Sequence, residues 1–285
     1  MRRLGRRILD ALFRWIRLIV HTFWPLLAVL IGIAVVVGIL GALGIVKLAF
    51  FSRVSPLYAR GTIIMLAATA VMLPLSFVLG FFIGWARIAE NPLAYSASTF
   101  FVELFRGTPQ LVVLLVGFFV FLPLFVGGIN LIAFAFWAGT VALAMHSAAY
   151  QAEIFRNGFQ SVPSGQIEAA HALGLTSWQT MRSVIFPQAF RVSLPPLGNE
   201  FANIVKDSAI ISFLGVLTVF GFMSFDLTGW GRQILQLAVL NATLNEAIFN
   251  WILVAIIYFV VIYVLTAAML ALERRMQVPG LEEAL

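Results

Sequence analysis

Charged and amide residues that interrupt long apolar segments are the part of this sequence best suited to chemistry. An ionisable side chain within a membrane-length apolar segment is energetically costly, so it is expected to contact a solute, an ion or a charged partner. We expect these side chains to point into protein or a water-filled path. We identify eight candidates for lining a solute path, namely Glu103, Arg106, Glu153, Asn199, Glu200, Asn203, Lys206 and Asp207.

Five of these candidates follow the proline pair at 195–196. If that pair opens a membrane-spanning helix at the cytoplasmic interface, a rise of about 1.5 Å per residue places Lys206 and Asp207 roughly 15 Å deep, near the midplane. The alternative is that these two residues only neutralise charged groups on adjacent helices. Helical spacing divides the five between two neighbouring faces, one with Asn199, Asn203 and Lys206 and the other with Glu200 and Asp207.

The other three candidates lie at Glu103–Gln110 and near the end of a later apolar segment. The Gly-Thr-Pro sequence within Glu103–Gln110 predicts a break in the helix, and irregular backbone at membrane depth is tolerated only against protein or a cavity. The alternative is an interfacial turn with a snorkelling Arg106. Glu153 either faces the same cavity or only forms a salt bridge with Arg156.

Enzyme chemistry has little support in the sequence. The chain has no cysteine, and His21, His146 and His171 are far apart, so we predict no metal site. It has no Gly-Lys pair and hence no nucleotide-binding P-loop. We therefore expect no catalytic residue and no cofactor, and any ATP must be hydrolysed by a partner protein.

Composition places the chain in the membrane. Hydrophobic residues make up 62% of it and charged residues only 11%, and the mean hydropathy is +1.02, which excludes a surface that is polar on all sides. The net charge of +6 does not predict nucleic-acid binding, because six arginines fall within the first seventeen residues. That cluster is typical of a basic segment beside membrane lipid.

Apolar segments of about twenty residues can cross a bilayer, and six are present. They lie near Phe23–Phe50, Arg60–Trp85, Phe100–Phe125, Ile129–Gln151, Leu197–Met223 and Ala247–Leu272. Basic residues favour the side that holds both termini, which makes that side cytoplasmic. That side has the N-terminal cluster with Arg87, Arg156, Arg182, Arg191, Arg274 and Arg275, whereas the other side has only Lys47, Arg53, Arg60 and Arg232.

The predicted fold is an all-α polytopic membrane protein in which the first span is separable from the rest. A polar segment, Ser52–Pro56, indicates a hinge between that span and the five that follow. On the opposite side, the stretch Trp230–Leu240 has an apolar stripe, and we expect it to lie flat in the membrane interface. The predicted division is a basic juxtamembrane segment at 1–22, an accessory helix and hinge at 23–55, a five-helix core at 58–275 and a cytoplasmic tail at 276–285.

A short helix is predicted in the cytoplasmic connection around Glu168. Pro163-Ser164-Gly165 is a helix start and Gly174 suits the position after a helix end. Small side chains at Ala169 and Ala170 would let the backbone of another protein approach closely. The alternative is an ordinary solvated loop helix.

Three classes of transport protein fit these features: a permease subunit driven by separate ATPases, an ion-coupled secondary transporter, and a channel. The first three and last three spans show no convincing internal repeat, which disfavours a secondary transporter. A channel would need a ring of repeated filter groups, and the sequence shows no such signal. The small-residue cytoplasmic helix favours the permease.

Several motifs match one family. Glu168, Ala169, Ala170 and Gly174 fit a cytoplasmic signature that begins EAA, continues to a glycine and closes with I-x-L-P, although Val184 and Phe186 depart from its last part. Further matches are ELFRGTP at 103–109, AEIFR at 152–156, SVP at 161–163 and LPPLGNEF at 194–201, followed by Lys206-Asp207. The chain thus resembles, over about residues 58 to 275, the permease subunits of bacterial ABC importers for polar amino acids, such as the histidine, glutamine and arginine permeases.

The resemblance implies an importer in the bacterial plasma membrane that is built from permease subunits, ATPase subunits and a binding protein. This chain would be half of the pathway, paired with an identical or paralogous permease subunit and bound to an ABC ATPase dimer. A periplasmic or extracellular binding protein would deliver the amino acid. The Glu168 helix would be the coupling helix, with Ala169, Ala170 and Gly174 seated in a groove of the ATPase.

Overall fold

The computed structural model describes residues 48–122, 131–217, 226–240 and 244–276, together with scattered helical positions between 24 and 42. The juxtamembrane segment, most of the predicted accessory span and the tail beyond 276 lie outside the described residues. The described elements are all helices: α2 (Leu48–Ala86), α3 (Pro92–Gly107), α4 (Gln110–Phe121), α5 (Leu131–Gln160), α6 (Ser164–Ala172), α7 (Ser177–Thr180), η2 (Met181–Ile185), α8 (Phe186–Asp207), η3 (Ser208–Ile211), α9 (Ser212–Leu217), α10 (Leu227–Leu240) and α11 (Leu244–Met276). The all-α prediction is confirmed for these ranges.

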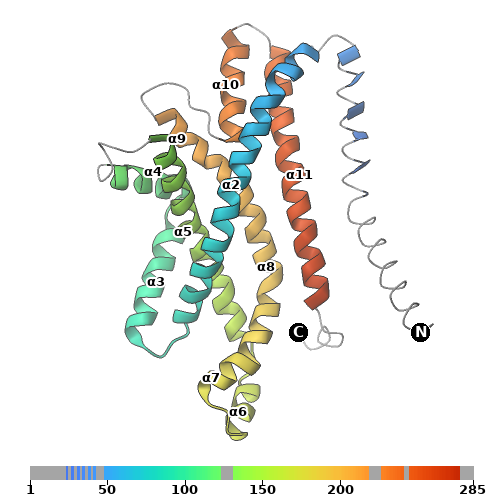
Figure 1. The fold of residues 1–285 in the computed structure, drawn as a ribbon. Coiled ribbons are helices and arrows are strands. Elements are labelled where there is room, and N and C mark those ends of the chain that lie inside the picture. Colours follow the sequence, from blue (N-terminus) through green and yellow to red (C-terminus); the bar gives the residue numbers. More distant parts are fainter. Residues whose placement is uncertain are drawn as a thin grey trace, which may run out of the picture.

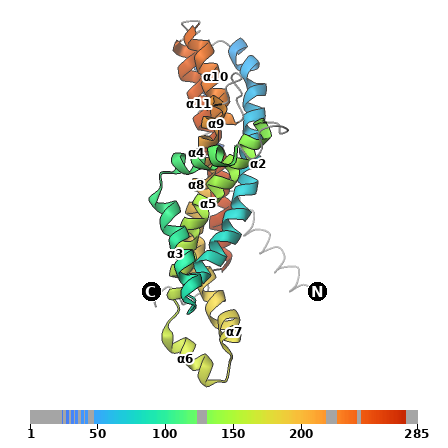
Figure 2. The same ribbon diagram turned by 90° about the vertical axis from the view of Figure 1, so that its left-hand side faces the viewer.

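Long helices run lengthwise through the molecule, and shorter ones lie both at its ends and, as α4 and α9 do, partway along it (Figures 1 and 2). Helices α6 and α7 project beyond one end, and α10 lies beside α2 and α11 at the other. By length and composition, α2 and α11 are long and apolar enough to cross a membrane, and α3 with α4, bent by 110°, would make a third span if the pair crosses as one unit. The count of six spans stays a prediction.

The bend between α3 and α4 confirms the predicted break at Gly-Thr-Pro. Thr108 has an extended backbone, and α4 restarts at Gln110 directly after Pro109. The third span begins earlier than predicted, because the side chain of Asn91 accepts hydrogen bonds from the backbone N–H groups of Leu93 and Ala94 and so caps a helix that starts at Pro92.

Two predictions that rested on prolines are wrong. Ser52–Pro56 is not a hinge but part of continuous helix α2, and Pro195-Pro196 lies inside α8 instead of opening it. Packing explains why the first of these segments stays helical: Val54 is buried in a cluster with residues of α10 and α11. A proline in a membrane helix is tolerated where neighbouring groups satisfy the freed backbone.

The stretch Trp230–Leu240 also differs from its prediction, since it does not lie flat in the interface. It belongs to α10, in which Leu227 and Ile234 are buried against Met65 of α2 and Val254 of α11. Its apolar stripe therefore covers protein and not lipid.

Helices α2 and α5 approach each other closely through small residues. A Cβ atom at Gly80 would lie 2.7 Å from the Cβ of Gln151, and one at Gly84 would lie 2.6 Å from the carbonyl oxygen of Ala152. Two glycines four residues apart let membrane helices pack with their backbones in near contact. This close approach fixes where the side chains of α5 around Gln151 and Ala152 lie relative to α2.

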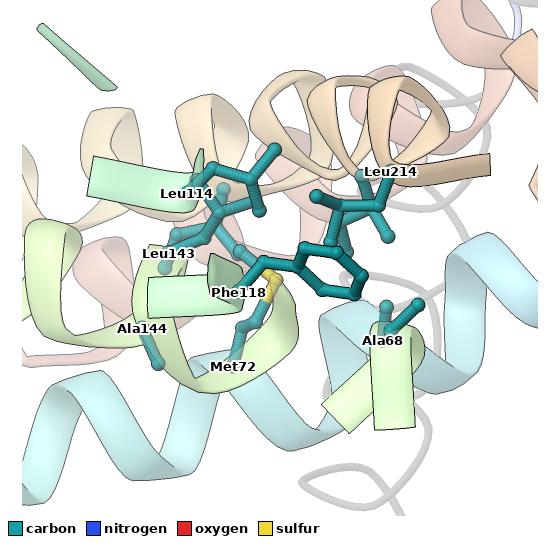
Figure 3. Close-up of a cluster of buried hydrophobic side chains, with 10 residues drawn as sticks. Ala68, Met72, Leu114, Phe118, Leu143, Ala144 and Leu214 are labelled. Atoms are coloured by element: carbon teal, nitrogen blue, oxygen red, sulfur yellow. The ribbon is translucent and has the colours of Figure 1, made fainter. Parts of the chain in front are cut away.

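An apolar core joins α2, α4, α5, α8 and α9 (Figure 3). The side chains of Met72, Leu114, Phe118, Leu143 and Leu214 converge in it. Burial of such large side chains is worth roughly 1.5–3 kcal/mol each in water, but between membrane helices the attraction is close packing rather than exclusion of water. This core anchors α4, the half-helix that follows the bend.

Candidate functional site

The projecting segment at one end of the molecule is an α6–α7 pair with well-formed helix ends (Figure 2). Helix α6 ends as predicted at Gly174, which has φ +82°, in the left-handed region that favours glycine. The N–H of Gly174 donates to the carbonyl of His171, and the N–H of Leu175 donates to the carbonyl of Ala170, the paired pattern of a Schellman cap. Thr176 and Gln179 then form a reciprocal capping box that starts α7.

The predicted docking residues do not all face outward. Glu168, Ala169 and Gly174 are exposed, and a Cβ atom at Gly174 would meet nothing within 4 Å. Ala170 is only 4% exposed, so the prediction that it offers its backbone to a partner is wrong. It packs inward, whereas Leu173 is 83% exposed beside Gly174. Sequence reasoning missed this leucine as part of the exposed surface.

Aromatic side chains connect this segment to the helix bundle. Trp178 of α7 lies with its ring centroid 6.2 Å from that of Trp85 near the end of α2. Phe81, one turn before Trp85, makes an edge contact with Phe186 at 5.7 Å. The side-chain amide of Gln188 in α8 donates a hydrogen bond of 2.6 Å to Gln166 of α6. The α6–α7 pair is therefore held against α2 and α8, which are the helices that a movement of the segment would displace.

One face of α8 is polar and open. Asn199, Asn203 and Lys206 are exposed, as their predicted common face requires. The ammonium of Lys206 lies 3.4 Å from Oδ1 of Asn203. The amide nitrogen of Asn203 lies 3.5 Å from a carboxylate oxygen of Glu200, whose other oxygen accepts a hydrogen bond of 2.7 Å from Ser147 of α5. Within the described ranges, no carboxylate lies within 4.0 Å of the Lys206 ammonium.

The other predicted face of α8 is partly buried. Glu200 turns toward α5, and Asp207, the last residue of α8, turns toward Gln110 of α4. The two predicted faces are thus observed. They differ in what they meet: one is open, and the other packs on neighbouring helices of the same chain.

Glu200 and Lys206 lie at different levels along α8. Glu200 is connected through Ser147 and Gln151 to Ser76 of α2. Ser76 is ten residues before the end of α2 at Ala86, about 15 Å along the helix. Lys206 is six residues farther along α8, about 9 Å beyond that level. The depth of Lys206 in the membrane stays a prediction, although α8 starts at Phe186 and not at the proline pair.

A separate cluster surrounds Glu153 at the end of the bundle near α6. The Glu153 carboxylate forms salt bridges with Arg87 after α2, with Arg106 of α3 at 3.7 Å and with Arg156 on its own helix. Glu103 lies 4.0 Å from Arg87, and its side chain is 69% exposed. The cluster ties three helices together, which matches the salt-bridge alternative for Glu153 and not an open cavity.

Burial alone would raise the pKa of the Glu153 carboxyl, but the hydrogen bond from Arg156 and the charges of Arg87, Arg156 and Arg106 bring it below its ordinary value. A carboxyl group with a lowered pKa stabilises the folded state above its unfolded-state pKa. That contribution is lost as the pH falls through the lower, folded-state value. The cluster thus holds the helices together at neutral pH and fails only in acid.

We expect Glu153→Gln to destabilise the chain, because it leaves three guanidinium groups without a carboxylate partner at their centre. The melting temperature in detergent at pH 7 should fall by about 2–4 °C for each kcal/mol lost. The difference from the unchanged chain should shrink as the pH is lowered. Glu90→Gln is the matched control, since Glu90 is exposed and has no salt bridge within the described ranges. Equal melting temperatures for the two variants would contradict the structural role.

The predicted path residues therefore form two groups, which lie against different faces of α5. Ser147 faces Glu200 of α8, whereas Glu153 faces the arginines of α2 and α3. Sequence reasoning missed Ser76, Ser147 and Gln151 as members of a polar group, and used Arg87 only to assign the cytoplasmic side. The available signal was the position of Gln151 at the end of an apolar segment and of Arg87 directly after another.

In the described part of the chain, no group of three or more His, Cys, Asp or Glu residues is arranged to hold a metal ion. The arrangement instead offers ammonium, amide and carboxylate groups along an open face. Such groups bind charged or polar solutes through hydrogen bonds and charge. An open polar helix face within a largely apolar bundle, with a projecting helical segment at one end, is typical of a solute-transport subunit.

Comparison with known proteins identifies the family. Residues 76–278 match the model of the binding-protein-dependent transport system inner membrane component family. The chain is 36% identical to a probable glutamine ABC transporter permease protein of Bacillus subtilis over 223 residues. The aligned region covers 78% of this chain and 94% of the relative. The chain is also 33% identical, with the same coverage, to the glutamine transport system permease protein of Escherichia coli. The chain belongs to this family of inner-membrane transport components.

Solved structures agree with this assignment. An amino acid ABC transporter crystallised with histidines superposes with a TM-score of 0.66 at 35% identity, over 81% of this chain and 99% of the other. The inward-facing methionine transporter MetNI has a TM-score of 0.60 at 22% identity and shares the fold. The resemblance to ABC-importer permeases is confirmed, and the alternative of an ion-coupled secondary transporter is not favoured.

Proposed function

We propose that this chain forms half of the pathway by which an ATP-driven importer carries a polar amino acid into the cell. The single observation that carries the proposal is the open face of α8, where Lys206 has no carboxylate partner in the described ranges and the Glu200 carboxylate lies 3.5 Å from the amide nitrogen of the exposed Asn203. A zwitterionic amino acid has a carboxylate for the ammonium of Lys206 and an ammonium for the carboxylate of Glu200. Asn199 and Asn203 on the same open face supply further hydrogen bonds to the solute.

Two further features support the remaining parts of the proposal. The exposed surface around Gly174 suits docking to an ATPase dimer, because a Cβ atom at Gly174 would meet nothing within 4 Å and the apolar Leu173 beside it is exposed. The α8 face needs a second permease subunit opposite it, identical or paralogous, to enclose a path. A binding protein outside the cell delivers the amino acid. The orientation has both termini and α6 in the cytoplasm of the bacterial plasma membrane, where the basic residues lie.

The direct test is uptake of labelled L-glutamine by vesicles that contain the purified complex and its binding protein. Glutamine is the probe because similar permeases bear its name; histidine and arginine serve as further probes. The expected result is uptake that requires ATP inside the vesicle and is unchanged by collapse of the proton gradient. Uptake driven by that gradient without ATP would overturn the proposal.

A further inference from the structure

Gln151 is a buried polar residue at the centre of a hydrogen-bond chain that crosses three helices. It is 0% exposed. Its amide nitrogen donates to the hydroxyl of Ser76 on α2 at 2.7 Å and to the hydroxyl of Ser147 on α5 at 3.2 Å. The Ser147 hydroxyl in turn donates to Glu200 of α8 at 2.7 Å. This hydrogen-bond chain ends at the Glu200 carboxylate, whose other oxygen lies 3.5 Å from the amide nitrogen of Asn203 on the open face of α8.

The direction of these bonds makes Ser147 a donor to Glu200. A serine hydroxyl has one proton to donate and accepts through its lone pairs. Because the Gln151 amide occupies an acceptor position of Ser147, the Ser147 proton is left to point at the carboxylate. Without Gln151, that hydroxyl could rotate toward a carbonyl of its own helix, as serines in helices commonly do.

The surroundings of Gln151 are not arranged for stability alone. Its amide oxygen is buried and has no hydrogen-bond partner among the described residues, and such an unpaired buried group has a cost in stability. The neighbouring α2 position is Gly80, where any Cβ would collide with Gln151. An apolar side chain of the same length would avoid this cost, so a glutamine here favours a role beyond packing.

We propose that Gln151 and Ser147 are positioning residues that fix the Glu200 carboxylate for the solute's ammonium group. The inference rests on the proposed role of Glu200 in the path. It predicts that stability and solute affinity change independently when the hydrogen-bond chain is cut. A residue that served packing alone would change both together.

The test compares Gln151→Met and Ser147→Ala with Ser147→Thr, which keeps a hydroxyl at the same place. ATP-dependent uptake of L-glutamine and the melting temperature are measured on the whole complex. We expect Gln151→Met and Ser147→Ala to raise KM by about 3- to 10-fold, the range for loss of one hydrogen bond, with the maximal rate and melting temperature unchanged or higher. Ser147→Thr should restore most of the affinity. Thr140→Val is the control, since Thr140 is buried on the same helix and, among the described residues, its hydroxyl donates to the carbonyl of Phe136 alone.

Glu200→Gln separates failure of this inference from failure of the proposed path. If Glu200→Gln raises KM and Gln151→Met does not, Glu200 meets the solute without help from Gln151, and the inference is wrong. If Glu200→Gln leaves KM unchanged, the path proposal at Glu200 is wrong and the inference falls with it. If Gln151→Met lowers the melting temperature as well as raising KM, Gln151 is a packing residue and the inference is wrong.

Discussion

Gly174→Asp should reduce transport by more than about tenfold while leaving the chain inserted in the membrane. Gly174 lies on the exposed end of α6, where a Cβ atom meets nothing within this chain, so the substitution acts on whatever packs there. A loss of about 1.4 kcal/mol in docking free energy already weakens a complex tenfold. Uptake of L-glutamine and co-purification of the ATPase are measured on the same preparation.

Gly174→Ala distinguishes docking from backbone strain. The φ of +82° at Gly174 is unfavourable for any L residue with a side chain, at a cost of roughly 1–2 kcal/mol. Alanine introduces that strain without charge or bulk and should retain most of the uptake. If alanine and aspartate were equally damaging, strain in the α6 cap would explain the loss. Normal uptake and normal ATPase binding with aspartate would remove the docking proposal.

Lys206→Met should raise KM for L-glutamine by about 10- to 100-fold, because it removes an ammonium that is proposed to bind the solute carboxylate, and hydrogen bonds to charged groups contribute about 1.5–3 kcal/mol. The uptake assay in vesicles gives KM and the maximal rate separately. Arg191→Met is the matched control, since Arg191 is an exposed cation nearer the start of the same helix.

The double variant Lys206→Met with Asp207→Asn tests the alternative role for these charges. If the two residues only neutralised each other, removing both would restore what either single change loses. We expect no such restoration, because Lys206 has no carboxylate within 4.0 Å in the described part of the chain, and its hydrogen bond goes to Asn203. Full recovery of KM in the double variant would show that the pair is structural.

Local features of the fold were predictable from sequence where a single residue type determines backbone geometry. Gly174 predicted the end of α6, and the Gly-Thr-Pro sequence predicted the break after α3. Pro195 and Pro196 misled because their effect depends on neighbours: within a packed membrane bundle the helix continues through them. The same dependence on packing explains why Ser52–Pro56 is helical.

The candidate path was predictable as a set of costly polar residues but not as a site. Sequence spacing placed Asn199, Asn203 and Lys206 on one face, as observed. It could not show that Glu153 is surrounded by arginines from three segments, because two of them are distant in sequence and approach it only in the folded bundle. Ser147 escaped notice for a similar reason, since a single serine in an apolar helix has no pattern of its own.

During synthesis, α2 enters the membrane well before its partner helix exists, because Gln151 follows Ser76 by 75 residues. Its mean hydropathy of 2.3 lets it reside in lipid alone. Until α5 arrives, Gly80 and Gly84 form an uncovered strip on its surface, and the two helices associate afterwards by lateral diffusion. Insertion and folding are thus separate events for this pair, and a substitution at either glycine acts on the second event without preventing the first.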